Sequence, residues 1–197
     1  MTNEATFADA LDRFQQLLRR AEATHLREPT AVALATADQA GRPSVRIVLL
    51  RGFDERGFVF FTNSESRKGE QLAENAHAGL CFYWDELSEQ VRIEGTAEPV
   101  TSEESDTYWS KRPRDSQIAS SASKQSQKLP DRETYERDVA ELESKLAGKE
   151  VPRPEHWYGY RVIPNRIEFW TRRDARMHER TVYEQDGESW KKYLVYP

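Results

Sequence analysis

The first apolar pattern along the chain has the spacing of an amphipathic helix. Apolar side chains recur at every third or fourth position, at Phe7, Leu11, Phe14, Leu17 and Leu18. This period predicts a helix over about residues 7–23. The pair Glu28–Pro29 ends this part of the chain, because a residue before proline avoids the helical conformation. We therefore expect residues 1–28 to form an N-terminal helical segment.

Beyond residue 29 the pattern changes to strands that are joined by short connections. Val32, Leu34 and Thr36 take alternate positions, which predicts a strand over residues 30–36. Further strands are predicted over residues 45–50, 58–62, 78–84 and 90–98, with a helix over residues 68–75. The short connections favour antiparallel pairing. Polar and apolar positions alternate over residues 90–95, so one face of that strand should meet solvent.

The second half of the chain mixes helical and strand patterns. Thr101 and Glu104 have the spacing of a capping box, which predicts a helix to about residue 111. Residues 119–128 are rich in Ser and Lys and are predicted as a loop, whereas residues 131–146 have helical spacing. Strands are predicted over residues 157–163, 166–170, 176–183 and 190–196. The sequence therefore predicts an α+β fold, a barrel of about seven or eight antiparallel strands with helices outside.

Composition and charge exclude several classes of function. The 197 residues include 29 Lys and Arg against 34 Asp and Glu, and the net charge of −5 disfavours a nucleic-acid binder. The single cysteine, Cys81, excludes an internal disulfide and a cysteine-built zinc site, and it fits a reducing cytosol. The N-terminus lacks a signal peptide's apolar stretch, and the longest apolar runs are far too short for a membrane span. We expect a soluble, cytoplasmic protein with no nucleic-acid or membrane partner.

Basic residues beside apolar strands are the first candidates for chemistry, since the four histidines are scattered and imply no metal site. Arg46 and Arg51 stand at the two ends of an apolar run. The simpler explanation is that the ends of this strand reach solvent, where charged side chains are expected. Arg67 and Lys68 follow Thr62 and open a predicted helix. A hydroxyl, two cations and a helix N-terminus together suit a phosphate group. The alternative is a solvated start of a helix.

A second cluster lies around residue 112. Tyr108 and Arg112 are four residues apart and would share one face of a helix. Together with Arg114 and Ser116, Arg112 could bind a second dianion.

A third cluster lies near the C-terminus. If residues 176–180 are extended, Arg176, His178 and Arg180 project from one face. The nearby Phe169 and Trp170 favour burial, which would be costly for cations without an anion. An exposed charged strand is the alternative. The basic clusters and their aromatic neighbours together predict a phosphorylated aromatic ligand, or two such ligands.

Five segments carry a resemblance to a known family. RIVLLR, FFTNSESRK, YWSKRPRDSQ, SKQS and IEFW…RMHER occur in the order and at the spacing found in the pyridoxine/pyridoxamine 5′-phosphate oxidase family, which the chain resembles from about residue 29 to 197. The resemblance implies a single FMN-binding split β-barrel domain over residues 1–197, with flanking helices. It also implies a homodimer with flavin sites at the subunit interface, each built from both chains.

The resemblance also assigns residues by matching positions. It implies that FMN is bound by Arg46, Ile47, Val48, Leu49, Leu50, Arg51, Phe61, Thr62, Arg67, Lys68, Gln90, Gln125, Ser126, Trp170 and Arg180. It implies that the substrate is bound by Arg51, Tyr108, Arg112, Ser116, Arg176 and His178, with Arg176 and His178 holding the substrate ring over the flavin as the catalytic pair. Arg51 stands where Lys is usual in the family, and Phe61 where Tyr is common.

The implied reaction is the oxidation of pyridoxine 5′-phosphate or pyridoxamine 5′-phosphate to pyridoxal 5′-phosphate, with O2 as electron acceptor and H2O2 as product. A related flavin oxidase of the phenazine-biosynthesis type is one alternative, although the presence of Tyr108, Arg112 and Ser116 favours a vitamin B6 phosphate. A flavin- or pyridoxal-phosphate-binding protein without activity is another.

Overall fold

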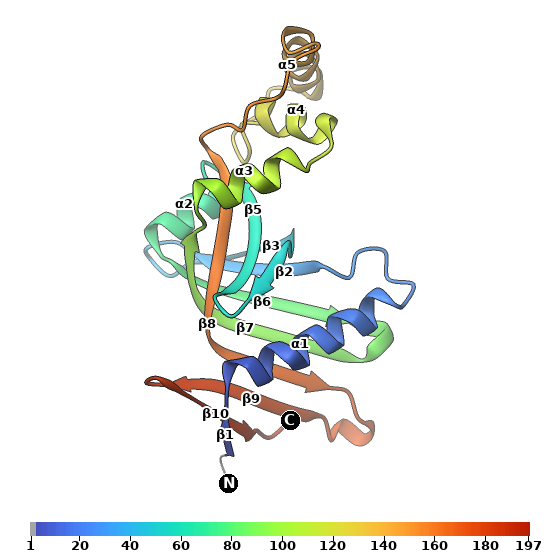
Figure 1. Ribbon diagram of the computed structural model, residues 1–197, viewed down its shortest axis with the longest axis vertical. Helices are drawn as coiled ribbons and strands as arrows, with labels where there is room; N and C mark the ends of the chain where they lie inside the picture. The colour runs from blue at the N-terminus through green and yellow to red at the C-terminus, as the bar shows by residue number, and fades with distance from the viewer. Residues whose placement is uncertain (1–2) are drawn as a thin grey trace.

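A single antiparallel sheet organises the molecule and curls into a half barrel (Figure 1). The computed structural model describes residues 3–197. Within them the sheet has ten strands: β1 (Asn3–Ala5), β2 (Ala31–Ala37), β3 (Pro43–Leu49), β4 (Gly52–Asp54), β5 (Gly57–Asn63), β6 (His77–Trp84), β7 (Glu89–Pro99), β8 (Trp157–Thr171), β9 (Glu179–Asp186) and β10 (Ser189–Leu194). The main order is β1-β10-β9-β8-β7-β6-β2-β3, and β5 pairs with β4 and β8. The predicted α+β fold is confirmed.

Five helices flank the sheet in the described part of the chain: α1 (Phe7–Glu22), α2 (Arg67–Glu74), α3 (Ser102–Ser110), α4 (Arg114–Ala122) and α5 (Arg132–Lys145). Two short 3-10 turns are also present, η1 (Asp85–Leu87) and η2 (Asp174–Arg176). Figure 1 shows α3, α4 and α5 at one end of the molecule and β9 and β10 at the other. The predicted capping box at Thr101 before α3 is formed, and the structure shows a second one at Thr6 before α1.

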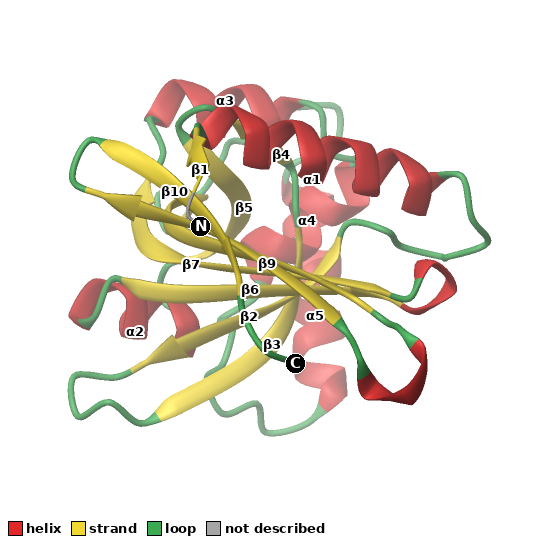
Figure 2. Cartoon of the chain, turned by 90° about the horizontal axis from the view of Figure 1, so that it is seen from below, coloured by secondary structure: helices red, strands yellow, loops and turns green. Residues whose placement is uncertain are grey.

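The main core lies between α1 and the inner face of the sheet, and Figure 2 shows this helix along one side of the strands. Phe14 is fully buried in α1, and its ring lies 4.9–5.2 Å from those of Phe53, Phe58 and Phe82. The helix predicted over residues 7–23 is therefore confirmed. Its apolar stripe supplies the hydrophobic contact that a helix of this length needs to be stable.

β8, with 15 residues, is the longest strand in residues 3–197, and it changes partner halfway. Residues 157–162 pair with β5, residues 166–171 pair with β9, and β7 pairs along both halves. The register with β7 shifts between Glu94 and Gly95, where a Cβ on Gly95 would lie 2.0 Å from the Ile163 carbonyl oxygen. The two separate strands predicted here are wrong, because the bulge bends one strand without ending it.

The loop predicted over residues 119–128 is wrong in its first part. α4 extends to Ala122, and Ile118 on this helix is buried in a small second core with Trp109, Val151 and Trp157. Tertiary packing of one apolar side chain thus overrides a Ser-rich local sequence. The predicted count of strands was also low, because β1 and β4 are three residues long.

None of the helices in residues 3–197 is long and apolar enough to cross a membrane. The same residues contain no cluster of three His, Cys, Asp or Glu side chains that could hold a metal ion.

Candidate functional site

A cavity of about 350 Å³ brings together many of the residues that the sequence assigned to a ligand. This inner cavity is lined by Ile47, Val48, Leu49, Arg51, Phe61, Thr62, Lys68, Tyr108, Arg112, Pro113, Ser116 and Gln125. Three of these side chains are cationic, and the lining contains no carboxylate from the described residues. A cavity of this size with uncompensated positive charge suits a small anionic molecule.

Lys68, at the start of α2, gives one wall of the inner cavity its charge. Its Nζ donates to Thr62 Oγ1 (2.9 Å), Ser66 Oγ (3.1 Å) and Gln125 Oε1 (3.0 Å). Burial lowers the pKa of Lys68 to about 8, and the Arg46 guanidinium adds to the shift. Because all three acceptors are neutral, a bound anion would supply the charge partner that this ammonium group lacks.

Arg112 belongs to the opposite wall, between α3 and α4. Its guanidinium carbon lies 4.7 Å from the centroid of the Trp157 ring, and its Nη2 donates to Ser120 Oγ (2.8 Å). Its Nε is buried without a hydrogen-bond partner in residues 3–197. Burial also lowers the pKa of Arg112. A buried donor with no acceptor is costly, so Arg112 fits a ligand that brings one.

Three nearly parallel rings hold this wall in place. Phe61 lies 4.1 Å from Tyr108 and 5.3 Å from Trp157 between ring centroids, with interplanar angles of 13° and 10°. Gly159 makes room for this stack, since a Cβ there would come within 2.8 Å of Phe61 Cε1. The stack joins α3, which carries Tyr108, to β5 and β8.

Seven residues assigned to FMN do not line the inner cavity: Leu50, Ser126, Arg46 and Arg67, and the three residues Gln90, Trp170 and Arg180. Leu50 is buried in the main core. Ser126, exposed with φ 73°, lines a neighbouring cavity of about 390 Å³ together with Gln125. Arg46 Nη1 donates to Thr36 Oγ1 (2.6 Å), and its Nη2 donates to Ser44 Oγ at 2.5 Å.

The fourth, Arg67, borders a larger cavity of about 740 Å³. The walls of that cavity also include Asp38, Glu70 and Glu74. Three carboxylates make it a poorer site for an anion than the inner cavity.

The C-terminal residues assigned by the resemblance gather elsewhere. Gln90, Trp170 and Arg180 are paired neighbours across β7, β8 and β9. They lie toward the end of the molecule formed by β9 and β10, whereas Trp157 begins β8 near the helical end (Figure 1). In residues 3–197 of one protomer, none of the three lines the inner cavity.

A buried carboxylate holds Arg180 in this row. Glu168 is 1% exposed, and its Oε1 and Oε2 accept hydrogen bonds from Arg180 Nε (2.8 Å) and Nη2 (3.0 Å). Its Oε2 also accepts from Arg166 Nη2 (3.0 Å) and from Arg92. Burial alone raises the pKa of Glu168, but the hydrogen bonds from the three arginines outweigh burial and hold it at about 2. Glu168 is thus ionised at neutral pH.

The extended segment predicted over residues 176–183 is wrong at its start. β9 begins at Glu179, and Arg176 lies in η2 with φ 61° beside Ala175 with φ 52°. Because β8 and β9 pair as a hairpin, the residues between them must turn. Arg176 therefore does not follow the strand alternation that would align it with His178 and Arg180, and it is exposed, contrary to the predicted burial.

His178 has a defined setting in the same turn. Its ring lies 4.7 Å from that of Trp170, between centroids. Its Nδ1 accepts a hydrogen bond from the Arg173 backbone N–H (3.1 Å), so a neutral His178 carries its proton on Nε2.

Sequence reasoning missed Trp157 and Glu168 as site residues. Glu168 carried a signal, because an acidic residue alternates there with Arg166 and Trp170 within an otherwise apolar strand. The sequence gives no such signal for Trp157 apart from its place at the start of a strand, because its contact with Arg112 depends on how α3 packs.

Comparisons with known proteins identify the family of this chain. Residues 18–146 match the family model described as pyridoxamine 5′-phosphate oxidase, and residues 157–197 match that of the pyridoxine 5′-phosphate oxidase C-terminal dimerisation region. The pyridoxine/pyridoxamine 5′-phosphate oxidase of Myxococcus xanthus is 50% identical over 189 residues, which cover 96% of this chain and 92% of the relative. The oxidase of the same name from Alkalilimnicola ehrlichii is 52% identical, with 95% and 97% covered.

A similar solved structure is that of PhzG from Burkholderia lata in complex with tetrahydrophenazine-1-carboxylic acid. It has a TM-score of 0.91 and 39% identity, and the match covers 95% of this chain and 92% of that one. An FMN-binding protein from Nostoc punctiforme, related to pyridoxamine 5′-phosphate oxidase, shares the fold with a TM-score of 0.77 at 18% identity, with 94% and 96% covered.

Proposed function

This chain belongs to the pyridoxamine 5′-phosphate oxidase family, and on that premise we propose that it is an FMN-dependent oxidase of vitamin B6 phosphates. It converts pyridoxine 5′-phosphate or pyridoxamine 5′-phosphate to pyridoxal 5′-phosphate, with O2 as acceptor and H2O2 as product. The observation that carries the proposal is the inner cavity, where Arg51, Lys68 and Arg112 meet without a carboxylate.

The residues present fit an FMN phosphate and ring. Lys68 lacks a charge partner and lies beside the hydroxyl of Thr62 and the amide of Gln125, which are donors and acceptors suited to an anionic ligand. Arg46 and Arg67 add positive charge near α2, and Ile47, Val48 and Leu49 of β3 border the inner cavity. When bound, FMN supplies the redox chemistry by accepting a hydride from the substrate and passing the electrons to O2.

The substrate phosphate is bound by the α3–α4 wall. Arg112 offers an Nε that has no hydrogen-bond partner in residues 3–197, and its guanidinium group already lies over the Trp157 ring. Tyr108, Ser116 and Arg51 supply further donors. This side of the inner cavity orients the substrate by its phosphate. The reacting part of the molecule is then aligned by Arg176 and His178, which position the substrate ring.

The site is completed by a second copy of the chain. Residues 157–197 match a dimerisation region, and Val45, Ile47 and Tyr83 are 66%, 64% and 51% exposed. Since Ile47 also lines the inner cavity, this exposed apolar edge is continuous with the site. A two-fold interface that covers it would bring the row of Gln90, Trp170 and Arg180 from the partner to the flavin.

A reducing cytoplasm is the proposed location, in keeping with the single cysteine. The proposal includes neither a nucleic-acid nor a membrane partner.

Oxidation of a phenazine precursor is the second candidate, and the similarity to PhzG favours it. The two activities share the flavin residues and differ in whether the substrate carries a phosphate. Arg112, Tyr108 and Ser116 in one cavity favour the phosphate.

A visible spectrum and a peroxide assay test the proposal. We expect the purified protein to bind FMN, to show the flavin absorption bands, and to release H2O2 with pyridoxine 5′-phosphate or pyridoxamine 5′-phosphate. Binding of FMN with no peroxide from either substrate would support a carrier without activity. Turnover of tetrahydrophenazine-1-carboxylic acid in their place would support the second candidate. A protein that ignores added FMN would contradict the proposal as a whole.

A further inference from the structure

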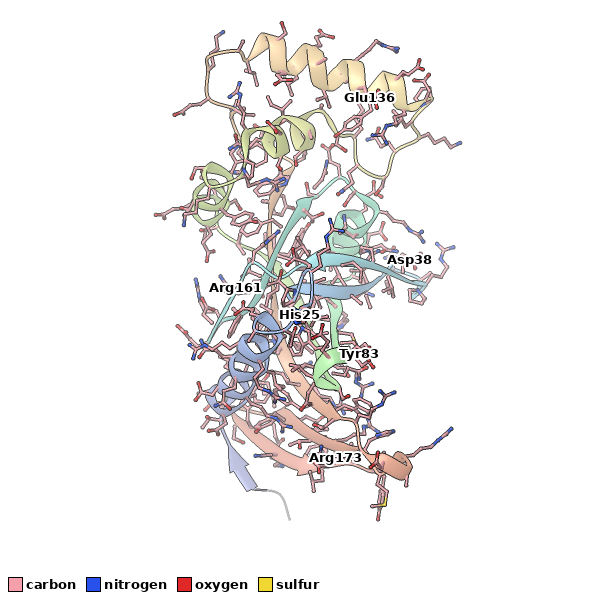
Figure 3. All side chains as sticks on the ribbon, turned by 90° about the vertical axis from the view of Figure 1, so that its right-hand side faces the viewer. His25, Asp38, Tyr83, Glu136, Arg161 and Arg173 are labelled. Atoms are coloured by element: carbon pink, nitrogen blue, oxygen red, sulfur yellow. The ribbon has the colours of Figure 1, made fainter. Side chains whose placement is uncertain are left out.

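Arg161 is a buried cation that joins two separate parts of the chain. Its side chain is 10% exposed on β8. Its Nη1 donates to Asp54 Oδ1 (2.9 Å) and its Nη2 donates to Glu104 Oε1 (2.7 Å). Figure 3 shows Arg161 at mid-height, between the helical end that carries Glu136 and the sheet end that carries Arg173.

Each of the two carboxylates stands close in sequence to a residue of the inner cavity. Asp54 ends β4, and Arg51 immediately precedes this three-residue strand. Glu104 lies in the first turn of α3, and Tyr108 follows it by four residues on the same face of the helix. Arg51 and Tyr108 both line the inner cavity. The two hydrogen bonds of Arg161 therefore connect the segment that carries Arg51 to the helix that carries Tyr108.

Glu104 divides its two oxygens between separate roles. Its Oε2 accepts from the Thr101 backbone N–H (3.1 Å) in the capping box, which leaves Oε1 for Arg161. Arg56 bridges the same two carboxylates from the solvent side: its Nη2 lies 2.6 Å from Asp54 Oδ2 and 3.2 Å from Glu104 Oε1, but its side chain is 58% exposed. A buried guanidinium with two charged partners constrains geometry more strongly than an exposed one.

We propose that Arg161 is a positioning residue for the substrate phosphate, because through Asp54 and Glu104 it sets the separation between Arg51 and Tyr108. The inference rests on the proposed function, which assigns these two residues to that phosphate. If the separation changes, one phosphate can no longer contact both walls well. Of the residues assigned to FMN only Arg51 belongs to this connection, and Lys68, Arg176 and His178 take no part in it, so FMN binding should change little and the chemical step should be spared.

The sharpest test is Glu104→Gln. Glutamine still accepts the capping-box hydrogen bond but loses the charge that holds Arg161. We expect KM for pyridoxine 5′-phosphate to rise about fivefold, with kcat and the FMN dissociation constant changed less than about twofold. Arg161→Met should raise KM further, on the order of tenfold or more, because both connections are lost.

Asp106→Asn is the matched control on the same helix. It breaks the Arg153 Nε–Asp106 Oδ1 pair (2.6 Å), which does not involve β4, and the Asp106 side chain is 62% exposed. KM should stay at the wild-type value. Inorganic phosphate, titrated by calorimetry into the FMN-loaded protein, should bind more weakly to Glu104→Gln by the same factor as the rise in KM.

Two results would overturn the inference: an unchanged KM and phosphate affinity in a folded Glu104→Gln protein, or a parallel loss of kcat, FMN affinity and thermal stability. Failure of the proposed function looks different, because the wild-type protein itself would then show no peroxide. The phosphate titration compares wild type and variant directly and needs no turnover.

Discussion

The two ends of β8 carry two half-sites that are built in different ways. At its start, Trp157 supports an enclosed cavity whose cations lack counter-ions. Near its end, Trp170 lies in an open row on the sheet, where Arg180 is already paired with Glu168 and Arg176 is exposed in a turn. The first half-site has cations that no carboxylate of its lining neutralises. The second has hydrogen-bond donors that lie on an open face of the sheet.

This difference indicates that neither half is a complete site. A flavin buried between the two half-sites needs both of them close to it. Within one chain they lie at opposite ends of β8, which has 15 residues and is on the order of 45 Å long at about 3.3 Å per residue. In the proposed homodimer, a two-fold axis would bring the end of one β8 to the start of the other. The dimerisation region matched by residues 157–197 contains Trp170, Arg176 and Arg180 of the open half-site.

The largest expected effect comes from mixing two inactive variants. Arg112→Met removes a phosphate-binding group from the enclosed half, and Arg176→Met removes a ring-binding group from the open half. Each should lower kcat/KM at least about a hundredfold. In a mixed dimer, one of the two sites receives both intact halves. After random exchange of equal amounts, half of the dimers are mixed, so activity should recover to about one quarter of wild type.

The control for this experiment pairs two changes in the same half. Lys68→Met mixed with Arg112→Met places a defect in every site, so activity should not recover. Absence of recovery with Arg112→Met and Arg176→Met, in dimers shown by mass spectrometry to have exchanged, would mean that both halves act within one chain.

A smaller effect is expected from Glu168→Gln, which acts inside the open half-site. Loss of this buried charge leaves three guanidinium groups facing one another, so the free energy of unfolding should fall by about 3 kcal/mol. Arg180 would also lose its orientation, and FMN affinity should fall roughly tenfold. Urea unfolding and flavin fluorescence measure the two effects.

Glu94→Gln is the matched control, because it breaks only the outer Arg166–Glu94 pair (2.9 Å), in which Glu94 is 54% exposed. It should change stability by less than about 1 kcal/mol. The folded-state pKa of Glu168, about 2, lies below the ordinary value of 4.5. Its stabilisation is therefore complete above that ordinary value and is lost as the pH falls toward 2. An acid transition unchanged by Glu168→Gln would contradict this account.

The fold could be predicted where local pattern and tertiary packing agree. The stripe of α1 and the alternating burial of β2 follow directly from side-chain period. Prediction failed where distant contacts decide the structure. Ile118 turns a Ser-rich stretch into α4 by packing near Trp109 and Trp157, and a close approach at Gly95 bends β8 without breaking it.

The candidate site shows the same division. Local motifs predicted Lys68, Arg112 and Arg180 as anion-binding groups, but they could not show which of these share a cavity. The cavity depends on where β5, α3 and β8 meet and, in the proposed dimer, on a second copy of the chain. The turn at Arg176 could not be read from alternation, because the hairpin pairing of β8 with β9 imposes it.

The smallest and most specific effect is a pH dependence that belongs to the enclosed half-site alone. Without a ligand, the pKa of Lys68 is about 8 against an ordinary 10.5. The folded protein therefore binds fewer protons than the unfolded chain between these values, and this group's contribution to stability rises with pH across that range.

An FMN phosphate beside Lys68 favours the charged ammonium and raises the pKa of Lys68, so FMN binding takes up a proton. FMN affinity should therefore be highest below pH 8 and should fall by up to about tenfold per pH unit above it. Titrations from pH 6.5 to 9.5 measure this slope, and Lys68→Arg, which stays charged throughout, should flatten it. The same slope in wild type and Lys68→Arg would place the titrating group elsewhere, and a flat wild-type profile would show that Lys68 does not face the phosphate.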